Sequence, residues 1–263
     1  MKKLIYLMVA IVVLGLIVSG CIPVVPPAEQ DEPGRLPKPT TPAPEIESGI
    51  FIDYQLPGPP QADTETDSYQ IRAGITWSTE PVKYRDADGV DRWTTWPVEY
   101  YINPANSSEI SDEDAITAIS AGFAAWEDDP DSVMNFVDPE DIKTTDSAGA
   151  ILDGMNTVSW KALGSDPNDP VAYCAYWYYP GTKTILEFDI VLNDSLPWSI
   201  PPLPTHFNVP SVATHEAGHT LILFDLRPWK DGLLTMYAFT WKGDNVKDTL
   251  GPGDRLGIRE LYP

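Results

Sequence analysis

Apolar residues recur along the chain at two spacings, and each spacing predicts a different kind of element. After Ser111 they fall three or four residues apart, which is the spacing of one buried face of an α-helix. Ser111 can cap this helix, and the acids at 112–114 lie where the helix dipole favours negative charge. Asp128-Asp129-Pro130 should end it. The apolar positions of this long helix are Ala115, Ile116, Ile119, Phe123 and Trp126.

Short runs rich in β-branched and aromatic residues, bounded by turn residues, predict strands in much of the remaining chain. A further apolar pattern predicts a second helix, which Asn208 or Ser211 can cap. Strands, one long helix, more strands and then helices describe an α+β domain. The predicted strands cover residues 98–102, 134–137, 157–160, 171–179 and 184–192.

A hairpin is predicted over Val82–Trp96, with its turn at Asp88-Gly89. Asp86, Asp88 and Asp91 flank this turn and could hold a structural Ca²⁺ ion. They lack the distal glutamate of a complete calcium-binding loop, so a solvated turn is the favoured interpretation.

The N-terminal residues predict the cellular compartment of the protein. An apolar run from Leu4 to Val18 follows two lysines and ends in Ser19-Gly20-Cys21, which resembles a lipoprotein signal peptide over residues 1–20. Such a signal implies that Cys21 is lipidated. The run is short for a membrane-spanning helix of about 20 residues, which independently favours export. The alternative is an uncleaved N-terminal anchor with an incidental cysteine; in both cases the rest of the chain is expected at the outer face of the cell membrane.

Proline dominates the segment that follows. Residues 22–60 contain 11 of the 27 prolines, a composition that favours extended polyproline geometry and cannot build a core. We therefore predict a lipid-anchored linker over 21–68 and a folded domain over 69–263. The linker is too short and too rich in proline to resemble an inhibitory prodomain.

Charge and cysteine content narrow the possible partners. The chain carries 17 Lys and Arg against 39 Asp and Glu, a net charge of −22, which repels phosphate backbones and excludes nucleic acid as a partner. Hydrophobic residues make up 43% of the chain, enough for a substantial core. If Cys21 carries a lipid, Cys174 has no partner and the domain has no internal disulfide.

The stretch His215-Glu216-Ala217-Gly218-His219 carries recognisable chemistry. On a helix, positions i and i+4 share one face, so His215 and His219 can bind a single Zn²⁺ ion. Glu216 lies about 100° around the helix from His215, where it can reach a water on that ion without binding the metal itself. Zinc lowers the pKa of such a water to about 7, and Glu216 can act as its general base. The alternative is a pair of surface histidines on a helix.

Together with Asp225 and Met236, this motif resembles the matrixin type of metzincin metalloprotease. That family follows the two histidines with a glycine and a third ligand, His or Asp, and then with a methionine-containing turn. Asp225 stands at the third ligand position here, and Met236, within Thr235-Met236-Tyr237, at the turn. The resemblance extends over about residues 93–263.

The resemblance implies the fold, the activity and the substrate position. The fold would be a zincin domain with a twisted, mostly parallel sheet, an antiparallel edge strand, a long helix, an active-site helix and a C-terminal helix. The activity would be zinc-dependent endopeptidase activity on extracellular proteins, with Met236 as an apolar floor below the metal. A peptide substrate would add to the edge strand, which Ala172, Tyr173, Cys174 and Ala175 match best.

One departure from the family pattern keeps a second interpretation open. Ile222 stands where the family has glycine, and a β-branched residue resists the positive φ that lets the chain turn away after His219. On a continuous helix, Asp225 would lie about 240° around the axis from His219 and could not share its ion. The alternative function is therefore a catalytically impaired, matrixin-like binding module at the cell surface. A structural surface-layer lipoprotein that binds no metal is a third interpretation.

Overall fold

The computed structural model describes residues 44–56, 92–137, 142–145, 149–227 and 231–263. The predicted signal peptide, the lipidation site at Cys21 and the three aspartates of the predicted calcium loop lie outside these residues. Among the helices in the described ranges, none combines the length and apolar character needed to cross a bilayer.

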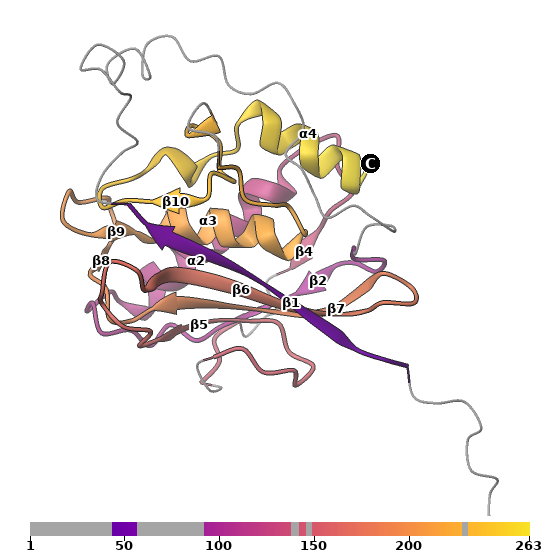
Figure 1. The fold of residues 1–263 in the computed structure, drawn as a ribbon, viewed down its shortest axis with the longest axis horizontal. Coiled ribbons are helices and arrows are strands. Elements are labelled where there is room, and N and C mark those ends of the chain that lie inside the picture. Colours follow the sequence, from indigo (N-terminus) through magenta and orange to yellow (C-terminus); the bar gives the residue numbers. More distant parts are fainter. Residues whose placement is uncertain (1–43, 57–91, 138–141, 146–148, 228–230) are drawn as a thin grey trace, which may run out of the picture. The chain divides into compact units, whose positions relative to one another are not determined.

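A six-stranded mixed sheet forms the centre of the domain, in the order β10-β1-β6-β7-β5-β3 (Figure 1). Strands β3, β5 and β7 run parallel, β6 pairs antiparallel with both β7 and β1, and β10 pairs parallel with β1. The predicted α+β class with a mixed sheet is confirmed. The strands are β1 (Glu47–Gln55), β3 (Tyr101–Ile102), β5 (Thr157–Lys161), β6 (Pro170–Tyr179), β7 (Thr184–Asn193) and β10 (Phe239–Thr240).

Two further pairs of short strands lie beside this sheet. Strand β2 (Val98–Glu99) pairs with β4 (Phe136–Val137), and β8 (Trp198–Ser199) pairs with β9 (Phe207–Asn208), both in parallel. The single strand expected over 98–102 is therefore divided between two sheets.

Strand β1 corrects the predicted linker. It lies inside residues 21–68, yet it pairs with β6 from Glu47 opposite Tyr178 to Tyr54 opposite Pro170. The physical reason is a period-two pattern: Asp53 is buried, whereas Ile50 and Tyr54 are exposed on the opposite face. Strand β6 consequently has neighbours on both sides and does not form the edge of the sheet.

Within the described residues, three α-helices complete the domain: α2 (Asp112–Glu127), α3 (Val209–Thr220) and the C-terminal α4 (Pro252–Leu261). The predicted cap of the long helix is confirmed, because the Ser111 hydroxyl accepts a hydrogen bond from the Asp114 amide at 3.1 Å. The indole of Trp126 in α2 donates to the Thr214 carbonyl at 2.8 Å, which holds α2 against α3. A short 3₁₀ helix, η2 (Val246–Asp248), precedes α4.

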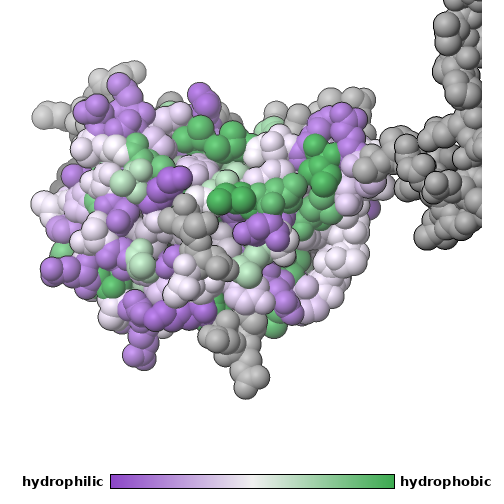
Figure 2. All heavy atoms as spheres, turned by 90° about the horizontal axis from the view of Figure 1, so that it is seen from below, coloured by the Kyte–Doolittle hydropathy of each residue, from purple (hydrophilic) through white to green (hydrophobic). Residues whose placement is uncertain are grey.

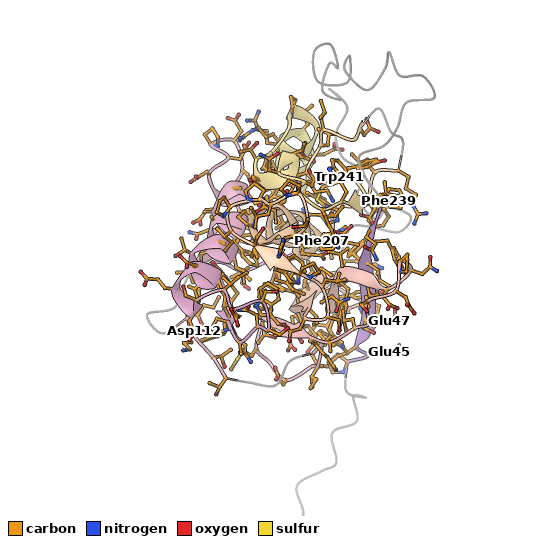
Figure 3. All side chains as sticks on the ribbon, turned by 90° about the vertical axis from the view of Figure 1, so that its left-hand side faces the viewer. Glu45, Glu47, Asp112, Phe207, Phe239 and Trp241 are labelled. Atoms are coloured by element: carbon orange, nitrogen blue, oxygen red, sulfur yellow. The ribbon has the colours of Figure 1, made fainter. Side chains whose placement is uncertain are left out.

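Aromatic side chains fill much of the core between the sheet and α2. Phe123 of α2 stacks on Tyr100 at 4.0 Å and on Phe188 of β7 at 5.8 Å. The face seen in Figure 2 is largely hydrophilic, with apolar patches between the hydrophilic residues. In the side view of Figure 3, α2 with Asp112 lies on one flank and β1 on the other, with Glu47 near one end of β1 and Phe239 of β10 near the other end.

Candidate metal centre

The two histidines of the motif lie one turn apart on α3. Both side chains are fully buried, and their Nε2 atoms are 3.2 Å apart. The predicted shared face is confirmed. Burial lowers the pKa of His215, and the neighbouring Lys247 lowers it further, so this imidazole is neutral and has a lone pair to offer to a metal.

A tight turn follows the second histidine. Helix α3 ends at Thr220, and Ile222 adopts a φ of 63°. The Leu223 amide donates to the Gly218 carbonyl at 3.3 Å, and the Ile222 amide donates to the His219 carbonyl at 2.9 Å. This pair of hydrogen bonds defines a Schellman motif, in which glycine usually takes the left-handed position. Isoleucine there costs about 1–2 kcal/mol, which burial of its side chain offsets.

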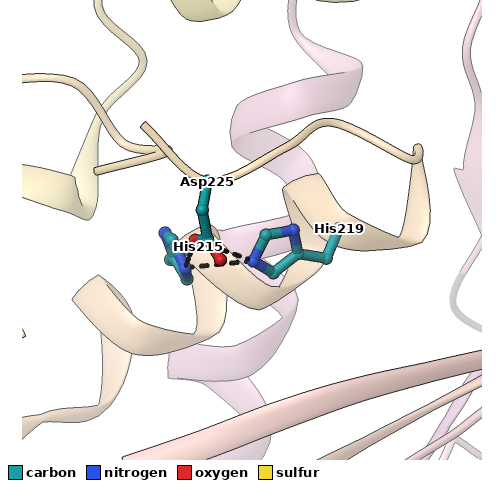
Figure 4. A group of neighbouring side chains, drawn as sticks. All are labelled: His215, His219 and Asp225. Carbon is teal, nitrogen blue, oxygen red and sulfur yellow. Dashed lines mark hydrogen bonds and ion pairs between the residues drawn. The ribbon is translucent and has the colours of Figure 1, made fainter. Parts of the chain in front are cut away.

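The turn brings Asp225 back over the histidines, as Figure 4 shows. Its Oδ1 atom is 3.4 Å from the Nε2 atom of His215 and 3.4 Å from that of His219. Bonds of about 2.0–2.1 Å to one tetrahedral ion require ligand atoms about 3.3–3.4 Å apart. Three edges of 3.2, 3.4 and 3.4 Å therefore fit three corners of one tetrahedral site.

Backbone carbonyls fix both imidazoles in the orientation that a metal needs. His215 Nδ1 lies 2.7 Å from the Thr235 carbonyl, and His219 Nδ1 lies 2.7 Å from the Leu223 carbonyl. Because a carbonyl can only accept, each Nδ1 carries the proton and each Nε2 keeps a free lone pair. The same turn that places Asp225 thus also orients His219.

Met236 packs against α3, and α4 holds the segment that carries Met236. The Met236 sulfur and the Trp126 ring pack so closely on Gly218, between the two histidines, that a Cβ atom there would overlap both. Asp254 of α4 accepts hydrogen bonds from the amides of Thr235 and Met236, at 2.9 and 3.2 Å. The C-terminal helix therefore holds the segment whose Thr235 carbonyl orients His215.

Carboxyl groups gather at the site without matching hydrogen bonds. Both carboxylate oxygens of Glu216 and Oδ1 of Asp225 are buried and have no hydrogen-bond partner. Burial raises the pKa of Glu216 well above its usual value, with contributions from Asp53 and Asp225. Burial also opposes ionisation of Asp225, but His219 and His215 hold its pKa below the usual range. Buried, unpartnered carboxylates of this kind are stabilised by a cation.

Within the described residues, two overlapping groups of acidic and histidine side chains are close enough to hold a metal ion. The first is the predicted set of His215, His219 and Asp225. The second joins His215 and Glu216 to Asp53 of β1, with one potential ligand atom of each within 4.8 Å of the others. A metal ion could therefore be held here, and its donor set of imidazole nitrogens and carboxylate oxygens suits a divalent transition metal.

The structure also shows where the predicted substrate strand and the remaining histidine lie. Ala172–Ala175 lie in β6, and the Cys174 side chain is fully buried. Burial raises the pKa of the Cys174 thiol well above its usual value, and Glu216 and Asp189 raise it further, so the thiol stays protonated. His206 lies in the loop between β8 and β9, where its Nδ1 contacts the Thr205 hydroxyl at 2.8 Å.

Sequence reasoning missed three contributors to the centre. Phe51 of β1 stacks on the His219 ring, with centroids 4.3 Å apart and planes 2° apart, and Asp53 faces His215. The signal that could have found them is the apolar run Ile50-Phe51-Ile52, which stands out in a proline-rich segment. The third is Lys247 of η2, a buried lysine whose Nζ is 2.8 Å from the Thr240 hydroxyl and 3.5 Å from His215 Nδ1.

Comparison of the chain with models of known protein families gives no match, and neither does comparison with curated protein sequences. The described geometry is compatible with a zincin-like site: an α+β domain with a mixed sheet and a helix that carries both histidines. What the arrangement can do chemically is hold one cation with three side chains and place the Glu216 carboxylate beside it.

Proposed function

We propose that this protein is a zinc-dependent endopeptidase of the matrixin type, with His215, His219 and Asp225 as zinc ligands and Glu216 as general base. One observation carries the proposal: three ligand atoms converge at 3.2–3.4 Å from one another, with an unpartnered, buried carboxylate next to them. Two imidazoles and one carboxylate make a donor set typical of catalytic zinc, which keeps its fourth position open.

Each protein group has a role in peptide hydrolysis. Bound zinc supplies a Lewis acid and lowers the pKa of water. Glu216 takes a proton from the attacking water and delivers it to the leaving amine, a task suited to a buried carboxylate whose pKa is raised. The Thr235 and Leu223 carbonyls hold the two imidazoles, so the ligands need no reorganisation during the reaction.

The turn at Ile222 supports the enzyme over the impaired binding module. The ground for the module was that isoleucine would not adopt the required positive φ. Its φ of 63° and the two hydrogen bonds of the Schellman motif remove that ground, because Asp225 reaches both histidines.

The proposed substrate is an extracellular protein, bound as an extended peptide along Ala172–Ala175 of β6, on the side that β1 occupies in the structure. Lipidation of Cys21 would anchor the enzyme to the outer face of the cell membrane, with the proline-rich segment as a spacer. Met236, packed on Gly218, would serve as the floor below the metal.

The test uses the purified full-length protein in detergent. We expect one zinc per chain by elemental analysis, and hydrolysis of an unstructured protein substrate that a chelator abolishes. His219→Ala should lose the zinc. Glu216→Gln should keep the zinc and lose about 10²–10⁴-fold in kcat/KM, the usual contribution of a general base. Glu113→Gln, an exposed carboxylate at the start of α2, is the control and should change neither quantity. Wild-type protein without zinc would refute the proposal.

A further inference from the structure

Strand β1 lies along the strand to which a peptide substrate should add. It pairs antiparallel with β6 over Phe51 opposite Cys174 and Asp53 opposite Ala172. Its last residues also pair with β10, in parallel, with Tyr54 opposite Phe239. Because β1 uses the outer hydrogen-bonding side of β6, a second extended peptide cannot use the same backbone groups at the same time.

The fit of β1 to β6 is specific in register. Gly49 stands opposite Tyr176, and a Cβ atom at Gly49 would overlap the Tyr176 ring. The Tyr178 hydroxyl donates to the Glu47 carboxylate at 2.6 Å. A shift by one residue would remove both contacts and would turn Asp53 to the other face of the sheet.

Two side chains of β1 point at the metal centre from this register. Phe51 covers His219 with a parallel stack at 4.3 Å. Asp53 is fully buried, neither of its carboxylate oxygens has a hydrogen-bond partner, and it lies with His215 and Glu216 in the second candidate metal group. A carboxylate in this state costs free energy unless a cation compensates it.

Asp53 and Glu216 are two carboxylates without hydrogen-bond partners beside His215, and the Asp225 carboxylate lies 3.4 Å from the same imidazole. Zinc held by His215, His219 and Asp225 would supply two positive charges to this cluster. Asp53, which lies in one group with His215 and Glu216, would be one of the negative charges that such an ion offsets.

We infer that β1 is a built-in occupant of the peptide site, with Phe51 covering His219 and Asp53 directed at the metal, and that β1 must leave before a substrate binds. This inference rests on the proposed function. It assigns to residues 47–55 a regulatory role, in which the chain holds its own endopeptidase latent, although the sequence predicts only a linker there that does not resemble an inhibitory prodomain.

The first experiment measures zinc affinity and hydrolysis in the same full-length protein. In Asp53→Asn we expect the zinc dissociation constant, measured by chelator competition, to rise at least tenfold, since a facing negative charge is lost. We expect kcat/KM to rise at least tenfold as well, because β1 is held less firmly. Weaker metal binding with faster hydrolysis is a combination that a merely structural role would not produce. Glu113→Gln, at an exposed carboxylate in α2, is the control and should change neither quantity.

The second experiment fixes β1 in place without changing the metal site. Ile50 and Ala175 are opposite each other in the β1–β6 pairing, on the face away from α3. In the variant with Ile50→Cys and Ala175→Cys, we expect the oxidised protein to keep its zinc and to hydrolyse substrate at least tenfold more slowly than the same protein after mild reduction. Equal rates in the two states would overturn the inference.

The outcomes separate the inference from the function on which it rests. If zinc binds and substrate is hydrolysed, but neither Asp53→Asn nor the disulfide changes the rate, β1 is an ordinary strand and only the inference fails. If no variant, Asp53→Asn included, binds zinc or hydrolyses substrate, both the proposed function and the inference fail.

Discussion

Asp225 and Asp53 both face His215, but they reach it by different routes. Asp225 follows the histidine by ten residues and is delivered by a tight turn whose hydrogen bonds begin inside α3. Asp53 belongs to a strand that comes far earlier in the chain and is held by pairing with β6 and β10.

The difference indicates which of the two carboxylates another group could replace. A turn of five residues cannot open without unwinding the end of α3, and the same turn orients His219 through the Leu223 carbonyl. A strand, in contrast, can be replaced by any extended peptide that offers the same backbone donors and acceptors. Asp225 therefore suits a permanent ligand, and Asp53 suits a removable one.

The largest loss of stability is expected for a substitution at Gly218, in the helix that precedes the turn to Asp225. A methyl group in Gly218→Ala would overlap the Met236 sulfur and the Trp126 ring, so we expect a loss of about 3 kcal/mol of stability and weaker zinc binding. Thermal unfolding with and without zinc measures this. Gly181→Ala is the matched control, since a Cβ atom there meets no heavy atom within 4 Å. If the two variants are equally stable, α3 is not held as tightly as the contacts indicate.

A smaller effect is expected at Ile222. Replacement by glycine relieves about 1–2 kcal/mol of backbone strain and removes a buried side chain worth about 2–5 kcal/mol. Ile222→Gly should therefore lose about 1–3 kcal/mol in denaturant unfolding while its zinc affinity changes less than twofold. Loss of zinc in this variant would mean that the isoleucine side chain, and not the turn itself, positions Asp225.

The sequence predicts well those parts of the site that depend on residues close together in the chain. It predicts poorly the contribution of β1, which comes from far earlier in the chain. Short-range rules predict the Ser111 cap, the long helix and the i, i+4 histidines, and tertiary contacts do not override them. Residues 47–55 lie among prolines, so composition outweighed a period-two pattern that extends over only a few residues. Pairing between segments more than a hundred residues apart leaves no trace in local spacing.

Ile222 illustrates a different limit. The helix rules correctly mark isoleucine as unsuited to a left-handed position, and the structure nevertheless places it there. The outcome depends on the burial of its side chain in the core, which the spacing of residues does not reveal. For the same reason the carbonyls of Thr235 and Leu223 could not be predicted as partners of the two imidazoles.

The smallest loss of stability is expected for a substitution in β1, at Phe51. Phe51→Ala removes the stack on His219 and the ring contacts with Tyr176 and Phe224, together worth about 1–1.5 kcal/mol at this half-buried position, and leaves the core between α2 and the sheet in place. We expect hydrogen exchange of the β1 amides to accelerate about five- to tenfold while the unfolding temperature falls by a few degrees at most. Uniform acceleration over the whole domain would show that β1 does not open separately from the rest.

The hydrogen bonds from Thr235 and Met236 to Asp254 have a consequence for biosynthesis. Ribosomes make α4 after β1 and α3, so the carboxylate that secures the support of His215 is added only after both of these elements. Strand β1 has by then long been available to pair. A polypeptide interrupted before residue 252 would consequently lack a properly held His215, so the proposed metal centre would be complete only in molecules whose β1 has already been made.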